Sequence, residues 1–324
     1  MVRASRIHVS QIALYWAVLT FGLALFWAVA LNAVQASGVG PAFTLVVPIV
    51  LGGIISVLYY FARSHIVLEY DDEGYRITKG KKHTETHTWS EFKECSVIRD
   101  GYGRNKVRAY TERDGKHFDV DTPTCGIDPY AFRDFMASRI RPHIDWELDS
   151  SSTPIFAGLE REIQRGRASW VADLNETFRD YQISGERFPL IARGSTRPKG
   201  FLLSRFVAVT LMPNYQVCLY AHDISRAENA SKARILRLIR IIESQRDEKD
   251  IKWSWLLLFR DQEPPEHVSK LIQEFGNKDV GIGSVDISTG DMITSPTQLG
   301  ASLRRQMRLN YLIRDLKKRR HMSA

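Results

Sequence analysis

Residues 9–62 contain no Asp, Glu, Lys, Arg or His, and this uninterrupted apolar stretch leads to the first prediction for the chain. A break of small and polar residues at 35–41 divides it into two segments, over about residues 10–34 and 42–62. A helix rises about 1.5 Å per residue, so roughly 20 residues match the roughly 30 Å hydrocarbon core of a bilayer. The pattern therefore predicts a transmembrane helical hairpin over residues 1–63.

Positive charge flanks the two predicted spans. Arg3 and Arg6 precede the first span, Arg63 follows the second, and the connecting loop carries no charge. The positive-inside rule then places both termini, and all residues after the hairpin, in the cytoplasm of a multi-pass protein of the cell membrane. An alternative is a signal peptide cleaved near Ala36, but its apolar region of about 25 residues exceeds the roughly 7–15 residues that are typical.

After the hairpin the pattern changes to short runs in which apolar and polar residues alternate, with turns rich in Gly and Asp between them. Such runs predict β-strands joined by hairpin connections. Asp128 and Pro129 then indicate a helix start, with Asp as N-cap and Pro at the first helical position. Residues 64–145 are thus expected to form a strand-rich domain closed by one helix, with strands at residues 66–70, 75–77, 84–89, 95–98, 106–110 and 117–120.

This order of strands and closing helix, behind two apolar segments, resembles the bacterial and archaeal pleckstrin-homology-like membrane proteins over residues 1–145. The motifs that carry the resemblance are EYDDEG at residues 69–74 and TWSEF at residues 88–92. The resemblance implies a small β-barrel capped by a C-terminal helix, used for assembly or lipid contact. It implies no active site.

Two local features of this domain contain residue types that bind lipids or metal ions. The basic turn at Lys79, Lys81 and Lys82 would meet anionic lipid headgroups, and the alternative is an ordinary solvated turn. His83 and His87 share one face of a predicted strand, but at about 3.3 Å per residue they lie roughly 13 Å apart. This separation is too large for one zinc ion, so no metal site is predicted.

A polar linker over residues 146–157 precedes a region in which helices and strands alternate, which predicts an α/β domain over residues 158–324. The uninterrupted apolar run at 253–259 predicts a central strand buried on both faces. The last helix expected is basic and C-terminal; the other elements expected are helices at about residues 158–181, 225–244 and 265–275, and strands at about residues 188–192, 206–211, 215–221, 253–259 and 280–285.

The order helix, three strands, helix, strand resembles the restriction-endonuclease-like fold over residues 155–320. Active members carry an Asp on one central strand and Glu-x-Lys on the next, where the carboxylates hold a metal ion. The runs at 206–211 and 215–221 lack these residues. The resemblance therefore implies a catalytically degenerate domain. The fold class expected for the whole chain is a membrane-anchored multidomain protein: a helical hairpin, a pleckstrin-homology-like barrel and an α/β domain.

A different catalytic site remains as an alternative. Asp223, Asp261 and Asp286 each follow a predicted strand, at the edge where open α/β sheets bind ligands. Three carboxylates there would serve a metal-dependent hydrolase. The favoured interpretation is that each Asp caps a turn or a helix. The sequence contains neither Gly-x-x-x-x-Gly-Lys nor Gly-x-Ser-x-Gly, and no cofactor or resident metal is predicted.

The composition indicates that the protein is basic and that its cysteines are reduced thiols. The chain has 324 residues, a formal net charge of +8, and three widely spaced cysteines that suggest neither disulfides nor a zinc ribbon. This charge favours contact with an anionic surface or a partner. The basic residues expected to make that contact lie on two helices: Arg234, Arg237, Arg240, Arg304, Arg305, Arg308, Lys317, Lys318, Arg319 and Arg320.

The function favoured by these observations is a non-catalytic, membrane-anchored scaffold or accessory subunit that presents its two domains to a partner in the cytoplasm. The expected partners are membrane lipids and a protein, either another chain or a second copy. One alternative is a membrane-tethered metal-dependent hydrolase or nuclease-like enzyme. Another is contact with nucleic acid at the inner membrane surface, which would be strongly dependent on salt.

Overall fold

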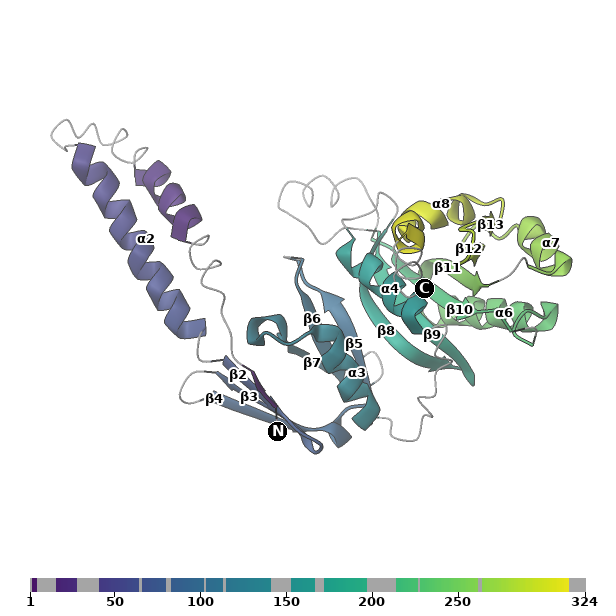
Figure 1. The fold of residues 1–324 in the computed structure, drawn as a ribbon, viewed down its shortest axis with the longest axis horizontal. Coiled ribbons are helices and arrows are strands. Elements are labelled where there is room, and N and C mark those ends of the chain that lie inside the picture. The colour runs from purple at the N-terminus through teal and green to yellow at the C-terminus, as the bar shows by residue number, and fades with distance from the viewer. Residues whose placement is uncertain are drawn as a thin grey trace.

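The computed structural model describes residues 2–4, 16–27, 41–63, 66–79, 83–101, 103–112, 115–140, 153–166, 172–196, 214–226, 228–261 and 264–314. Figure 1 shows these residues as an open arrangement of two sheets and their helices. The elements are β1 (Val2–Ala4), a helical stretch over residues 16–27, α2 (Pro41–Arg63), β2 (Ile66–Tyr70), β3 (Gly74–Lys79), β4 (His83–Thr88), η1 (Trp89–Glu91), β5 (Glu94–Arg99), β6 (Asn105–Tyr110), β7 (His117–Val120), η2 (Pro123–Cys125), α3 (Pro129–Ile140), α4 (Thr153–Arg165), β8 (Asp173–Ile183), β9 (Glu186–Ser195), β10 (Gln216–Asp223), α6 (Lys232–Lys249), β11 (Ile251–Arg260), α7 (Glu266–Glu274), β12 (Val280–Asp286), β13 (Met292–Thr294) and α8 (Gln298–Gln306).

The larger sheet has nine strands in the order β13-β12-β11-β10-β9-β8-β5-β6-β7. The pairs β10–β11 and β11–β12 are parallel, and the remaining pairs are antiparallel. The helices α6 and α7 lie between the parallel strands in the chain, as a parallel connection requires. The sheet runs through both predicted domains, because β5 of the first pairs with β8 of the second.

Helices cover the two faces of this sheet unequally. On one face α4 and α8 pack through Phe156, Leu159 and Leu303 onto Trp255 and other buried strand residues. On the opposite face α6 and α7 form a second core over β9, β10, β11 and β12. Successive residues of β11 therefore enter different cores, so this strand is buried on both faces. The second face has no described helix over β5, β6 and β7.

The smaller sheet has four strands, in the order β1-β2-β3-β4, and shares a core with α3 and with the β5–β7 end of the larger sheet. Leu68 and Tyr75 from the small sheet lie in this core with Phe132 and Met136 from α3. The predicted barrel is wrong. Among the described strands β4 pairs with β3 alone, while β5 pairs with β6 and β8, so the sheets do not close on one another. The fold is mixed α/β with two sheets.

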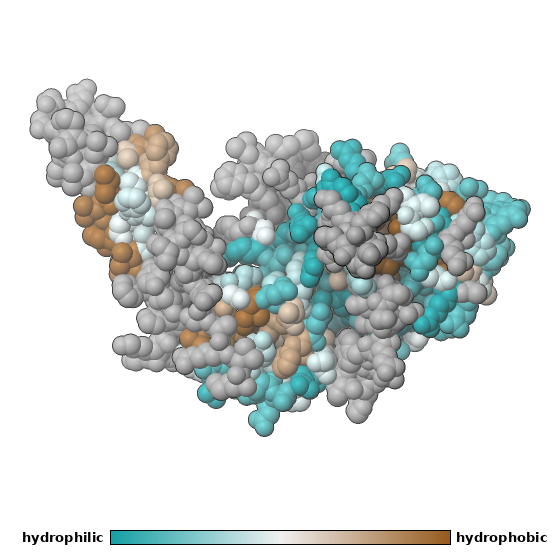
Figure 2. Space-filling model, viewed as in Figure 1, coloured by the Kyte–Doolittle hydropathy of each residue, from teal (hydrophilic) through white to brown (hydrophobic). Residues whose placement is uncertain are grey.

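Among the described residues, no helix combines the length and the apolar composition needed to cross a membrane. Helix is described over residues 16–27 of the first predicted span, and α2 covers the second. The absence of a spanning helix among the described residues contradicts the predicted transmembrane hairpin, the cell-membrane localisation and the resemblance to pleckstrin-homology-like membrane proteins. Figure 2 shows apolar side chains on the surface of both stretches.

Most strands predicted after residue 64 coincide with observed strands, but the helix predicted over residues 158–181 is wrong in its second half. α4 ends at Arg165, and residues 173–183 form β8. β8 is an inner strand between β5 and β9, and its residues Leu174, Phe178 and Tyr181 are buried. Hydrogen bonding to a strand on each side therefore determines the conformation of β8 and outweighs the local helical preference of its sequence. The strand predicted over 206–211 lies outside the described residues.

Candidate functional site

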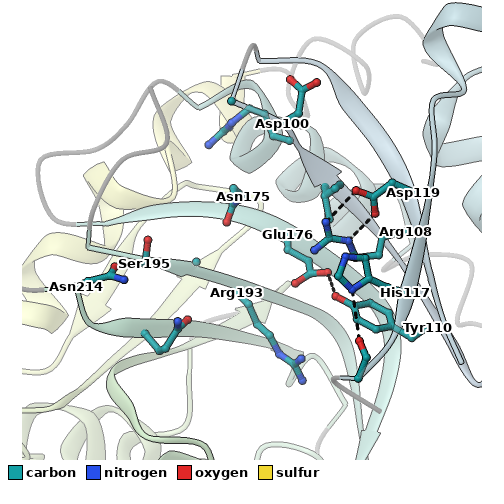
Figure 3. A pocket seen from close by; sticks show the side chains of 16 residues that line it. Asp100, Arg108, Tyr110, His117, Asp119, Asn175, Glu176, Arg193, Ser195 and Asn214 are labelled. Carbon is teal, nitrogen blue, oxygen red and sulfur yellow. Dashed lines mark hydrogen bonds and ion pairs between the residues drawn. The ribbon is translucent and has the colours of Figure 1, made fainter. Parts of the chain in front are cut away.

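A hollow of about 770 Å³ lies on the sheet face that α6 and α7 leave open (Figure 3). It crosses the junction between β5 and β8, which we call the seam. The ladder at the seam is short, with Val97 paired to Thr177 and Ile98 to Glu176. We call this cavity the seam hollow; its lining comprises Ile98, Arg99, Asp100, Gly101, Arg108, Tyr110, Gly115, His117, Asp119, Asn175, Glu176, Arg193, Gly194, Ser195, Asn214 and Gln216.

Side chains reinforce the short ladder from within the hollow. Glu176 of β8 accepts a hydrogen bond from Ser96 Oγ of β5 at 2.8 Å, and the same carboxylate oxygen accepts one from the Tyr110 hydroxyl of β6. Burial and the negative charge of Glu176 both raise the pKa of Tyr110 well above its ordinary value. The hydroxyl therefore keeps its proton and remains a donor across the seam.

A cross-strand ion pair forms one wall of the hollow. Arg108 of β6 lies opposite Asp119 of β7 and donates two hydrogen bonds to it, from Nε to Oδ1 at 2.7 Å and from Nη2 to Oδ2 at 3.0 Å. Such a two-point contact fixes both planar groups. The His117 ring lies beside the Tyr110 ring, with centroids 5.6 Å apart, and is exposed to solvent.

A β-bulge forms the opposite wall. In the pairing of β8 with β9, Leu174 lies opposite Gly194 and Glu176 opposite Arg193, so Asn175 is an extra residue. Bulges redirect side chains and are frequent beside binding sites. Figure 3 shows Asn175, Glu176 and Arg193 facing the same cavity. The Arg193 guanidinium lies 4.6 Å from the Phe178 ring centroid, a cation–π contact that orients it.

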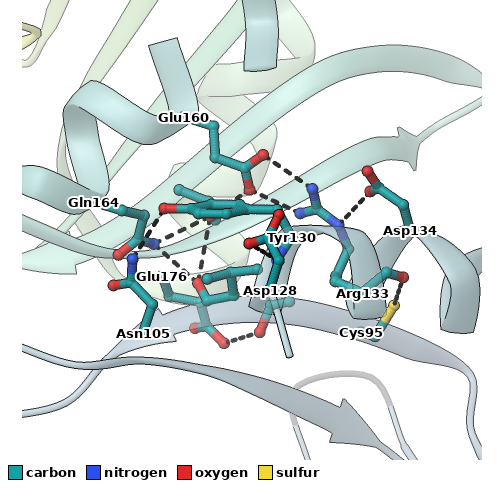
Figure 4. Close-up of polar contacts among 12 residues, drawn as sticks. Cys95, Asn105, Asp128, Tyr130, Arg133, Asp134, Glu160, Gln164 and Glu176 are labelled. Atoms are coloured by element: carbon teal, nitrogen blue, oxygen red, sulfur yellow. Dashed lines mark hydrogen bonds and ion pairs between the residues drawn. The ribbon is translucent and has the colours of Figure 1, made fainter. Parts of the chain in front are cut away.

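Behind the seam, on the other sheet face, α3 and α4 are joined by a buried polar network (Figure 4). Arg133 of α3 donates to both carboxylate oxygens of Glu160 on α4, at 2.7 and 2.9 Å. Thr177 Oγ1 donates to the same carboxylate at 2.7 Å, and Gln164 Nε2 donates to the carbonyl oxygen of Val97 at 2.9 Å. The network therefore connects α3, α4, β5 and β8.

The protonation of this network follows from its geometry. Burial alone would raise the pKa of Glu160, but the charge of Arg133 and its two hydrogen bonds outweigh burial, so the pKa of Glu160 lies below its usual range. Burial lowers the pKa of Arg133, while Glu160 raises it more strongly, so the guanidinium stays charged. Both partners are ionised at neutral pH.

The three predicted carboxylates do lie at one edge of the sheet, because β10, β11 and β12 are parallel and end together. Asp223 Oδ1 accepts from the Ser225 backbone N at 2.8 Å. Asp286 Oδ1 accepts from the Ser288 N at 2.7 Å, and its Oδ2 accepts from Arg260 Nη1 at 3.3 Å. These two residues thus cap turns.

Asp261 follows β11 and is exposed. Within the described ranges, no group of three or more His, Cys, Asp or Glu residues is placed to hold a metal ion. The predicted trio is therefore not gathered into a metal centre by the part of the chain that the structure describes.

The basic residues of α6 are divided between an internal contact and the surface. Arg234 forms an ion pair with the buried Glu186, and Arg237 Nε lies 3.8 Å from the other oxygen of that carboxylate. His222 Nε2 also lies 3.6 Å from Glu186. Burial lowers the pKa of His222. Arg240 is exposed to solvent.

The predicted basic C-terminal helix is interrupted: α8 ends at Gln306, a turn follows at residues 307–308, and helix resumes over residues 309–314. Both helical pieces pack on their own domain. Arg304 donates to Asn310 Oδ1 at 2.9 Å, and Arg308 Nε lies 3.2 Å from a Glu162 oxygen, while Arg305 is exposed. Lys79 ends β3, and its side chain is outside the described part. The remaining predicted contact residues lie outside the described residues: Lys81, Lys82, Lys317, Lys318, Arg319 and Arg320.

Sequence reasoning missed the seam hollow, because its walls come from strands that are far apart in the chain. One signal was present. In β6 and β7 the polar residues Arg108, Tyr110, His117 and Asp119 alternate with Val107, Ala109, Phe118 and Val120, which predicts a polar face opposite a buried one. The bulge at Asn175 and the β5–β8 pairing leave no comparable local pattern.

No family model matches the chain, and no curated protein or solved structure matches it. The resemblance to a degenerate restriction-endonuclease-like domain therefore has no support from these comparisons, and it is withdrawn with the first resemblance.

Proposed function

We propose that this protein is a non-catalytic interaction protein that binds a polar ligand in the seam hollow and is stabilised by it for contact with a partner. The observation that carries the proposal is the position of the hollow across the seam. Strands β5, β6 and β7 supply one wall, and β8, β9 and the start of β10 supply the other. Ligand sites occur preferentially at such junctions.

The carboxylates of the hollow favour binding over catalysis. Asp119 is held at two points by Arg108, and Glu176 accepts from Tyr110 and Ser96. Asp100 contacts Arg104 at 3.1 Å and Lys106 at 3.4 Å. Carboxylates whose orientation is fixed by such contacts are suited to binding a ligand. A general base, in contrast, needs a lone pair directed at the proton that it removes.

A ligand that touches both walls would stabilise the folded chain. A ligand at 100 times its Kd adds about 2.7 kcal/mol to the free energy of unfolding. In a domain of 150–250 residues each kcal/mol raises the Tm by about 2–4 °C. The expected rise is therefore several degrees, which thermal unfolding measures directly.

The test is thermal unfolding of the full-length protein against a panel of sugars, nucleotides, inositol phosphates and amino acids at 10 mM. At least one class should raise the Tm, and the double variant N175A/N214A should lose that rise. The control variant Q273A changes an exposed residue of α7, which lies at a distance from the seam hollow, and should retain the Tm rise. An equal Tm rise in the wild type, N175A/N214A and Q273A would place the binding site outside the hollow and refute the proposal. A panel in which no compound raises the Tm of the wild type would refute it as well.

A further inference from the structure

We infer that the seam hollow binds an uncharged, hydroxyl-rich ligand, in chemical class a saccharide. This inference rests on the proposed function and names its ligand. Among the described lining residues, Arg108 and Arg193 lie beside two carboxylates, Asp119 and Glu176. The other charged lining groups are neutralised by residues outside the lining: Arg99 pairs with Asp173, and Asp100 pairs with Arg104 and Lys106. The whole chain is basic, with a formal net charge of +8, so this local balance differs from the rest of the protein.

The balance disfavours a polyanion. Phosphate-binding sites gather guanidinium groups without competing acids, so that each phosphate meets a field of one sign. In the seam hollow Arg193 lies directly opposite Glu176 across the β8–β9 ladder, and Arg108 is held by Asp119. A phosphate placed beside either arginine would also lie near a carboxylate.

The remaining polar groups suit hydroxyls. A hydroxyl donates one hydrogen bond and accepts two, and an amide side chain offers both a carbonyl oxygen and an NH₂ group. Asn175 of β8 and Asn214, just before β10, both lie in the wall formed by β8, β9 and the start of β10, and Figure 3 shows both at the cavity. The planar Arg108–Asp119 pair adds fixed donors and acceptors at a third position. Adjacent hydroxyls on one ring can bond to such planar groups two at a time.

The size and the aromatic surface of the hollow agree with this ligand class. A volume of about 770 Å³ lies within the roughly 300–1,000 Å³ of sites that enclose drug-sized molecules, so more than one sugar ring fits. The exposed His117 ring, beside Tyr110, offers a flat surface for the apolar face of a ring.

The experiment measures binding of the full-length protein to a glycan array and then, by calorimetry, to the best neutral oligosaccharide. ATP and inositol hexakisphosphate form the anionic arm. We expect a neutral glycan to bind with an affinity that changes little between 50 and 500 mM NaCl. N175A/N214A should weaken it by about tenfold or more, because each lost hydrogen bond contributes a factor of a few to ten. D119N should weaken it as well, and Q273A should not.

The outcomes separate the inference from the proposed function. Salt-dependent binding of ATP or inositol hexakisphosphate that N175A/N214A abolishes would overturn the saccharide inference and leave a ligand site in the hollow. Glycan binding that all variants retain would overturn both, because the site would lie elsewhere. No binding in either arm, with the wild type folded by circular dichroism, would overturn the saccharide inference alone, because the thermal-unfolding panel of the proposed function also contains amino acids and other nucleotides.

Discussion

Glu160 and Arg133 form the most enclosed ion pair described behind the seam, and each is almost fully buried. The position of Glu160 on a helix was predictable from the sequence, since the expected helix over 158–181 includes it. Its partner was not, because Arg133 lies on a different helix 27 residues earlier, and no local periodicity relates the two. Such a pair follows from tertiary packing alone.

Glu160→Ala should lower the free energy of unfolding by about 3–5 kcal/mol, because it leaves the Arg133 charge buried without its partner. Urea unfolding measures this as a lower midpoint. Glu274→Ala is the matched control, since Glu274 pairs with Lys270 on the surface and both are about two-thirds exposed. That control should change stability by less than about 1 kcal/mol. Equal effects of the two variants would contradict a structural role for the buried pair.

The same carboxylate predicts how stability depends on pH. Because the pKa of Glu160 is lower in the folded chain, its contribution is fully present above the unfolded value, about 4.3, and is lost as pH falls through the lower folded value. Unfolding curves of the wild type should therefore show a fall in stability below about pH 4.3. Glu160→Gln should be less stable at neutral pH and should show a shallower fall. Parallel curves would exclude Glu160 as the titrating group.

At the scale of elements, local pattern predicted the hairpin strands well and failed at β8. β2 and β3 are joined by a turn with recognisable chemistry, in which the Asp71 side chain accepts from the Gly74 backbone N at 3.2 Å. The sequence directly before β8, residues 167–172, contains no Gly, Pro, Asn or Asp, and β8 itself mixes charged with apolar residues, so its sequence fits helix and strand alike. Pairing to β5 and β9 decides between them.

The C-terminal segment, α8 and the helical residues 309–314, makes a second element-scale prediction. Leu303, Met307 and Leu312 are buried in the core shared with α4 and β11. Deletion of residues 302–324 should therefore prevent folding of the larger sheet, which circular dichroism and solubility would detect. Deletion of residues 315–324 keeps all three side chains and should leave the fold intact. A soluble, folded product of the longer deletion would instead identify the helix as a binding tail.

At the scale of the molecule, the sequence predicted two domains separated by a linker, and that division stays a prediction. The structure adds a single sheet that passes through both halves, together with the α3–α4 network behind the seam. The Val97–Thr177 pairing joins residues 80 apart in the chain, and no pattern within a short window specifies it. This is why the seam hollow and its two walls could not be predicted.

Continuity of the sheet predicts that the two halves lose stability together. Phe132→Ala, in the core of the first half, should reduce hydrogen-exchange protection in β8 as well as in β6, because the halves share the seam. A large-to-small change at such a buried site costs about 3–5 kcal/mol. Tyr311→Ala, at an exposed position, is the control and should leave both strands protected. Protection lost in β6 alone would show that the halves unfold independently.

The order of the strands also has a consequence during synthesis. β5 leaves the ribosome long before β8, because 80 residues separate their paired positions. At about 5–20 residues per second, roughly 4–16 s pass before the partner strand is complete. During this interval the inner edge of β5 presents unpaired backbone groups, which are open to pairing with another copy or to capture by a chaperone.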